Sequence, residues 1–167
     1  MQDANHPRSN PTHPQPPPEA TMRTITRTVE LDATPQQVWE VLTDAVAYAD
    51  WNPFITKMDG DLEVGRRIEV RIAPPGGKPM TFRPTVTHVD PAHHLAWLGH
   101  LLLPGLFDGA HSFTLEPLPD NRTQLTQSET FRGLLVSFSG GLLQRTEAGF
   151  AAMNEALRQR LAQRHSA

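Results

Sequence analysis

The alternation of apolar and polar positions predicts one strand, two short helices, a run of strands and a long final helix. Residues 24–31 alternate as expected for a half-buried strand. Thr34 and Gln37 have the spacing of a capping box, directly before the apolar positions of a short helix. A second short helix is expected to end at residues 52–53, Asn-Pro, because the residue before a proline disfavours helix.

Strand patterns continue from residue 55 to residue 133, separated by turn sequences rich in Gly and Pro. Toward the end of the chain the spacing of apolar residues changes from strand-like to helix-like. The apolar side chains there fall on one helical stripe: Leu143, Phe150, Met153, Leu157 and Leu161. A long helix with one apolar stripe needs a broad apolar surface to cover it. The pattern therefore predicts an α+β fold, in which an antiparallel sheet of about seven strands wraps around a long C-terminal helix.

The apolar face of this predicted sheet carries four polar side chains, namely His88, His111, Gln127 and Glu129. Tight turns fix the register of neighbouring strands and so place side chains opposite each other. The predicted pairs are His111 with Glu129, Phe113 with Gln127, Trp97 with His111, Leu95 with Phe113, His88 with Leu95, and Val86 with Trp97.

An unpaired carboxylate on such a face costs several kcal/mol, so Glu129 must be neutral, hydrated or paired. His111 and Arg27 are the candidate partners. One interpretation is a structural His–Glu hydrogen bond in a solid core. The other, which we favour because four polar residues are many for a dry core, is a cavity whose polar groups orient a ligand. The predicted lining is Trp51, Phe82, Val86, His88, Leu95, Trp97, His111, Phe113, Gln127, Glu129, Phe131, Phe150 and Met153.

Three stretches carry a family resemblance: VELDATPQQVWEVLTDAVAYADWNPFI (29–55), HSFTLEPLPDNRTQLTQSETFRGLL (111–135) and GFAAMNEALRQRL (149–161). With the order of elements, they resemble the helix-grip fold of the START-like, or SRPBCC, superfamily, and within it the polyketide cyclase/dehydrase and lipid-transport families. The resemblance spans about residues 23–164 and implies a deep pocket between sheet and C-terminal helix. Members of the superfamily use this pocket for lipids, sterols, polyketides, quinones and hormones, so the resemblance names no ligand.

Three functions follow as hypotheses. The first is binding or transport of a small hydrophobic molecule such as a lipid or polyketide, oriented by the polar residues of the cavity. The second is an enzyme of the cyclase/dehydratase type, with His111 and Glu129 as proton-transfer groups. The third is a partner-binding module, like a chaperone activator. In that module Leu135, Val136 and Phe138 in the segment 133–141 would form an exposed patch.

Composition and net charge further limit the kind of protein and the partners that can be expected. The chain has 167 residues, no cysteine and a net charge of −3, which fits one domain in a reducing, cytoplasmic setting and does not favour nucleic acid as a partner. No apolar run approaches the length of a membrane-spanning helix, so no stable membrane insertion is expected. We expect no cofactor, and we interpret His88, His93 and His94 as a solvated turn rather than a metal site. The oligomeric state, monomer or homodimer, stays open.

The first 22 residues are rich in Pro, Asn and His and almost free of hydrophobic side chains. Such a segment cannot bury enough apolar surface to offset its loss of conformational entropy. We therefore predict a disordered tail over residues 1–22, one domain over 23–164 and disordered residues 165–167. A shorter product that starts at Met22 is a second possibility.

Overall fold

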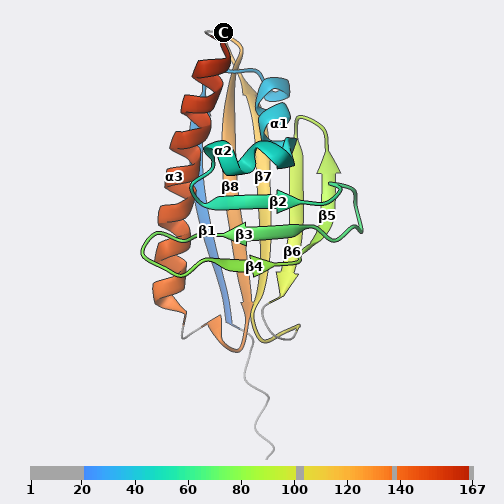
Figure 1. Ribbon diagram of the computed structural model, residues 1–167, viewed down its shortest axis with the longest axis vertical. Helices are drawn as coiled ribbons and strands as arrows, with labels where there is room; N and C mark the ends of the chain where they lie inside the picture. Colours follow the sequence, from blue (N-terminus) through green and yellow to red (C-terminus); the bar gives the residue numbers. More distant parts are fainter. Residues whose placement is uncertain (1–20, 101–103, 137–138, 166–167) are drawn as a thin grey trace, which may run out of the picture.

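The computed structural model describes residues 21–100, 104–136 and 139–165, and it has the predicted α+β architecture (Figure 1). In chain order the elements are β1 (Thr21–Leu31), α1 (Pro35–Thr43), the 3-10 turn η1 (Ala45–Ala47), α2 (Tyr48–Trp51), β2 (Ile55–Asp59), β3 (Glu69–Ile72), β4 (Met80–Phe82), β5 (Thr85–Asp90), β6 (His94–His100), β7 (Asp108–Leu118), β8 (Arg122–Gly133) and α3 (Gly140–His165). The predicted capping box of the first helix is present, with Thr34 and Gln37 each bonded to the other's backbone N–H.

The described strands form two antiparallel sheets rather than the single sheet that the sequence predicted. The larger sheet has the order β1-β8-β7-β6-β5, and the smaller has the order β2-β3-β4. The predicted strand at 80–89 is divided at Pro84, so that β4 joins the small sheet and β5 the large one. Proline has no N–H for a strand ladder, which explains the break. In Figure 1 the small sheet crosses in front of the large one.

Registers in the large sheet confirm most of the predicted pairs. His111 lies opposite both Glu129 and Trp97, while Phe113 lies opposite both Gln127 and Leu95. The β7–β8 register follows from the short turn at residues 119–121, because a slip by one residue would have moved every side chain to the other face.

The predicted position of His88 on the apolar face is wrong. The β5–β6 register shifts between Val86 and His88, so that His88 pairs with Ala96 and Val89 takes the place opposite Leu95. Such a bulge adds one residue to a strand and reverses the faces beyond it. The His88 side chain is exposed on the outer face, with its ring 5.0 Å from that of His94. Partial burial and, secondly, the nearby His88 lower the pKa of His94.

At the N-terminal end, β1 begins at Thr21 and pairs with the end of β8, two residues before the predicted start of the domain. The remainder of the predicted tail, residues 1–20, lies outside the described residues. The final helix α3 continues to His165, one residue beyond the predicted end, and residues 166–167 also lie outside the described part.

The apolar stripe predicted for the last helix is the face of α3 that is buried in the core. Phe150, Met153, Leu157 and Leu161 are all buried there. Gly149, on the same helix, lets the ring of Phe54 pack directly on the backbone, and this ring also meets Phe150 edge-on at 5.7 Å. Neither α3 nor any other helix in the described part of the chain combines the length and apolarity that crossing a membrane requires.

Candidate functional site

The interior between the sheets and α3 is solid in one half and hollow in the other. In the solid half Leu95, Phe113, Phe150 and Met153 are almost fully buried and pack on one another across β6, β7 and α3. Gln127 is buried with them and donates a hydrogen bond to Asn154 of α3. These side chains, together with Val86, were predicted to line a cavity, and the structure places them in packed core instead.

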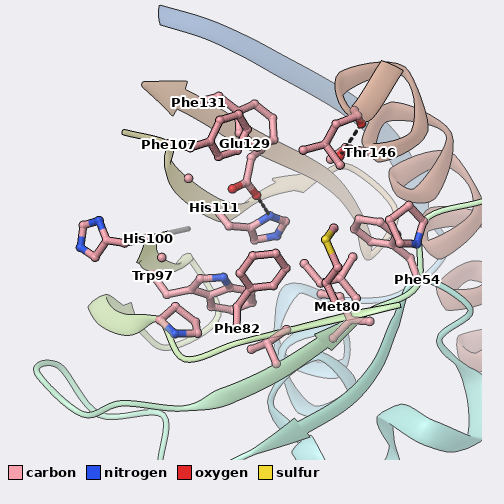
Figure 2. A pocket seen from close by; sticks show the side chains of 18 residues that line it. Phe54, Met80, Phe82, Trp97, His100, Phe107, His111, Glu129, Phe131 and Thr146 are labelled. Carbon is pink, nitrogen blue, oxygen red and sulfur yellow. Dashed lines mark hydrogen bonds and ion pairs between the residues drawn. The ribbon is translucent and has the colours of Figure 1, made fainter. Parts of the chain in front are cut away.

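The hollow half forms a cavity between the small sheet, the ends of β6–β8 and the first turns of α3 (Figure 2). Its lining consists of Phe54, Ile55, Val70, Ile72, Pro74, Met80, Phe82, Pro84, Trp97, Gly99, His100, Phe107, Gly109, His111, Glu129, Phe131, Leu142 and Thr146. The cavity has a volume of about 80 Å³. The cavity is therefore narrow, mainly apolar and large enough for several waters or one small molecule.

Five of the predicted lining residues do line this cavity: Phe82, Trp97, His111, Glu129 and Phe131. Sequence patterns did not reveal the other lining residues of the small sheet, such as Met80, or Leu142 and Thr146 in the first turns of α3, because they did not predict that a second sheet crosses the first. One signal that the sequence does contain was missed. Gly99 and Gly109 are cross-strand partners on the apolar face, and Gly109 lies opposite Phe131. Two facing glycines leave a gap where side chains would otherwise fill the core.

The polar centre of the cavity is a histidine–glutamate pair. Nδ1 of His111 lies 2.8 Å from Oε2 of Glu129, and the two side chains are only 5% and 14% exposed. The imidazole stacks on Trp97 at 4.8 Å, and the ring of Phe150 meets its edge at 5.3 Å. These aromatic contacts and the carboxylate fix the orientation of the imidazole, much as a carboxylate orients histidine in proton-transfer sites.

The second ring nitrogen of His111 is the most informative atom of the site. Nε2 is buried and has no hydrogen-bond partner among the described residues. Figure 2 shows it on the side of the ring away from Glu129, toward Met80 and Phe82. A buried polar atom without a partner costs about 1–3 kcal/mol, so native proteins usually satisfy such an atom with water or a ligand.

The structure decides between the two candidate partners of Glu129. Arg27 instead forms an ion pair with Glu147 on α3, at 2.8 Å, with both side chains partly exposed. His111 is therefore the partner of Glu129. Trp51, which was predicted to line the cavity, packs against Tyr48 at 5.3 Å as part of the core and is absent from the lining.

A second histidine–carboxylate pair lies at the more exposed edge of the cavity. Nδ1 of His100 is 2.6 Å from Asp108, whose carboxylate also accepts hydrogen bonds from the backbone N–H of Gly105. The pair joins the ends of β6 and β7 and holds the turn at Gly105. It was not predicted from the sequence, although the predicted β6–β7 register places His100 opposite Asp108.

The segment 133–141 only partly matches the predicted exposed patch. Leu134 and Leu135 are 48% and 40% exposed, but Val136 is 1% exposed and belongs to the core, which corrects the prediction for this residue. Phe138 lies outside the described residues. Within the described part of the chain, no group of three or more His, Asp or Glu side chains is placed to hold a metal ion.

Comparison with known proteins agrees with this architecture. A family model described as polyketide cyclase / dehydrase and lipid transport matches residues 22–165. The chain belongs to this family. This member of the START-like superfamily has the antiparallel sheets and long C-terminal helix of the helix-grip fold. No curated protein matches the sequence.

Solved structures share the fold of this family member over nearly its whole length. Norcoclaurine synthase from Thalictrum flavum, a point mutant in complex with a transition-state analogue, is 19% identical with a TM-score of 0.70, covering 89% of this chain and 99% of the other. The Zhui aromatase/cyclase from a Streptomyces species is 22% identical with a TM-score of 0.68, over 86% and 96%. A START superfamily protein from Mycobacterium smegmatis is 18% identical with a TM-score of 0.66, over 84% and 97%. At these identities the likeness shows the fold alone.

Proposed function

We propose that this protein binds one small, mainly apolar molecule in the cavity and orients it by a hydrogen bond to Nε2 of His111. The observation that carries the proposal is the buried Nε2 without a partner in the described residues. Around it the lining is mostly aliphatic and aromatic, with Trp97 and Phe131 as flat walls. Apolar surroundings with one fixed polar group are typical of ligand sites, in which burial supplies affinity and the polar group selects the orientation.

The fixed orientation of the His111 imidazole is a second reason to expect a ligand. Glu129 bonds Nδ1, and Trp97 stacks on the ring, so the direction of Nε2 is set before any ligand arrives. A group that is already oriented loses little conformational freedom on binding. A structural His–Glu bond in a solid core would not need a hollow beside the free nitrogen.

The test replaces His111 by Asn and measures the binding of methyl 2-naphthyl ketone by calorimetric titration. The asparagine amide can still donate to Glu129 but offers nothing at the position of Nε2. We expect affinity to fall by at least about tenfold, the effect of losing a hydrogen bond from a protonated imidazole to the ketone oxygen. The matched control is His93→Asn, since His93 is 65% exposed at a turn outside the cavity lining. Wild-type affinity in His111→Asn would contradict the proposed role of Nε2.

A second candidate function, proton transfer on a bound ketone, is favoured by one specific observation. The carboxylate of Glu129 holds His111 at 2.8 Å while the other ring nitrogen faces the cavity, which is how a general acid/base is oriented. Such a group would exchange the α-hydrogens of a bound ketone with solvent.

This candidate predicts that the protein accelerates deuterium incorporation into the methyl group of methyl 2-naphthyl ketone in D₂O, measured by proton NMR. A contribution of general acid–base catalysis is about 100-fold or more, and His111→Asn should remove it. If the wild type exchanges no faster than buffer while it binds the ketone, the cavity binds without proton transfer.

A further inference from the structure

Provided that the cavity is the ligand site proposed above, we infer that it selects uncharged ligands and that Glu129 is the residue that rejects anions. The ligand class is then a neutral molecule with a ketone or hydroxyl group, and fatty acids and phosphates are excluded. The described lining has no free cation, the His111–Glu129 pair cannot carry a net positive charge, and the Glu129 carboxylate lies at the wall of the cavity.

The described lining of the cavity contains one carboxylate and no lysine or arginine. Its ionisable members are Glu129, His111 and His100, and the latter two are each already paired with a carboxylate. Arg27, which reaches α3 from β1, is engaged by Glu147. A bound anion would therefore find no free positive charge on the wall of the cavity.

The His111–Glu129 pair cannot supply a net positive charge in either of its charged arrangements. With a neutral imidazole the pair carries one negative charge, and with a protonated imidazole it carries none. An anion would meet repulsion in the first case and a neutral dipole in the second. Because the site is largely removed from water, the lost hydration of the anion would have no replacement.

The carboxylate is also in the right place to act on a ligand. Glu129 uses Oε2 for His111, and its Oε1 lies against the Cα of Gly109, on the lining of the cavity. A ligand group that bonds Nε2 of His111 is therefore within the field of this carboxylate. A ketone can accept from a protonated Nε2, a hydroxyl can bond either form, and neither carries a charge that Glu129 would repel.

Two probes of nearly the same shape test the inference: methyl 2-naphthyl ketone and 2-naphthoate, titrated calorimetrically into the wild type at pH 7.5. We expect the carboxylate to bind at least about tenfold more weakly than the ketone, because a like charge and lost hydration both oppose it. In Glu129→Gln the amide keeps a hydrogen-bonding group beside His111 without the charge. Because that variant removes the like charge but not the cost of dehydrating the anion, the difference in affinity between the two probes should shrink by at least about threefold.

Glu116→Gln is the matched control, because the exposed Glu116 lies on β7 outside the lining and bonds the neutral side chain of Gln124, so the change releases no cation and should keep the wild-type preference. Equal binding of both probes to the wild type overturns the charge selection and leaves the proposed ligand site intact. Binding of neither probe overturns the proposed site and the selection with it. An unchanged preference in folded Glu129→Gln overturns the assignment to Glu129. The wild-type comparison holds even if the variant fails to fold.

Discussion

Gly149→Ala is expected to lower the free energy of unfolding by about 2–3 kcal/mol, the cost of overpacking a well-filled core. A methyl group at this position would overlap the ring of Phe54, closer than any real Cβ contact. The ring cannot easily yield, because Phe54 is buried and packs edge-on against Phe150 of the same helix. Chemical denaturation of the purified variant measures the loss.

The matched control is Gly141→Ala, in the first turn of the same helix. A Cβ there meets nothing within 4 Å. Alanine favours helix over glycine by up to about 1 kcal/mol, so this change should leave the protein as stable or slightly more so. If Gly149→Ala unfolds at the same denaturant concentration as the wild type, the close packing of Phe54 on α3 is incorrect.

Gly109→Ala is expected to weaken binding of methyl 2-naphthyl ketone by about tenfold, because the imidazole would no longer be held in the orientation that binds the ligand. A Cβ on Gly109 would collide with Oε1 of Glu129. The carboxylate must then swing away from Nδ1 of His111, and the imidazole loses the bond that orients it. The backbone of Gly109 is not in the left-handed region, so the effect comes from the added methyl group alone.

Gly141→Ala, the control used above for Gly149, also provides the comparison here, because Gly141 lies outside the cavity lining and a Cβ there meets nothing within 4 Å. We expect its affinity for the ketone to stay within about threefold of the wild type, as for a tolerated small change. Equal affinities for Gly109→Ala and the wild type would show that the position of the Glu129 carboxylate does not matter for binding.

Local patterns in the sequence are sufficient to predict the central pair of the site. The turn between β7 and β8 covers only residues 119–121, so the alternation of residues by itself places His111 opposite Glu129. The predicted pairing of Trp97 with His111 is also present, although the connection between β6 and β7 is longer. The stripe on α3 is equally predictable, because helical spacing alone identifies the face that is buried.

The position of the cavity could not be predicted from the same patterns. The bulge after Val86 moved His88 to the outer face, and alternation alone cannot detect an inserted residue. The break at Pro84 sent β4 into a second sheet, which brings Met80 and Phe82 across from His111. Both the bulge and the break depend on how strands that are distant in the sequence pack against each other. The facing glycines at 99 and 109 were visible in the sequence, and they mark the hollow half of the interior.

A crystal structure of the wild type soaked with methyl 2-naphthyl ketone tests the central claim most directly. We predict the naphthalene ring in the cavity beside Trp97 and Phe131, with the ketone oxygen about 2.7–3.2 Å from Nε2 of His111, a normal hydrogen-bond distance. A ketone that binds in solution but lies outside this cavity, or lies inside it with its oxygen turned away from His111, would contradict the proposed binding mode.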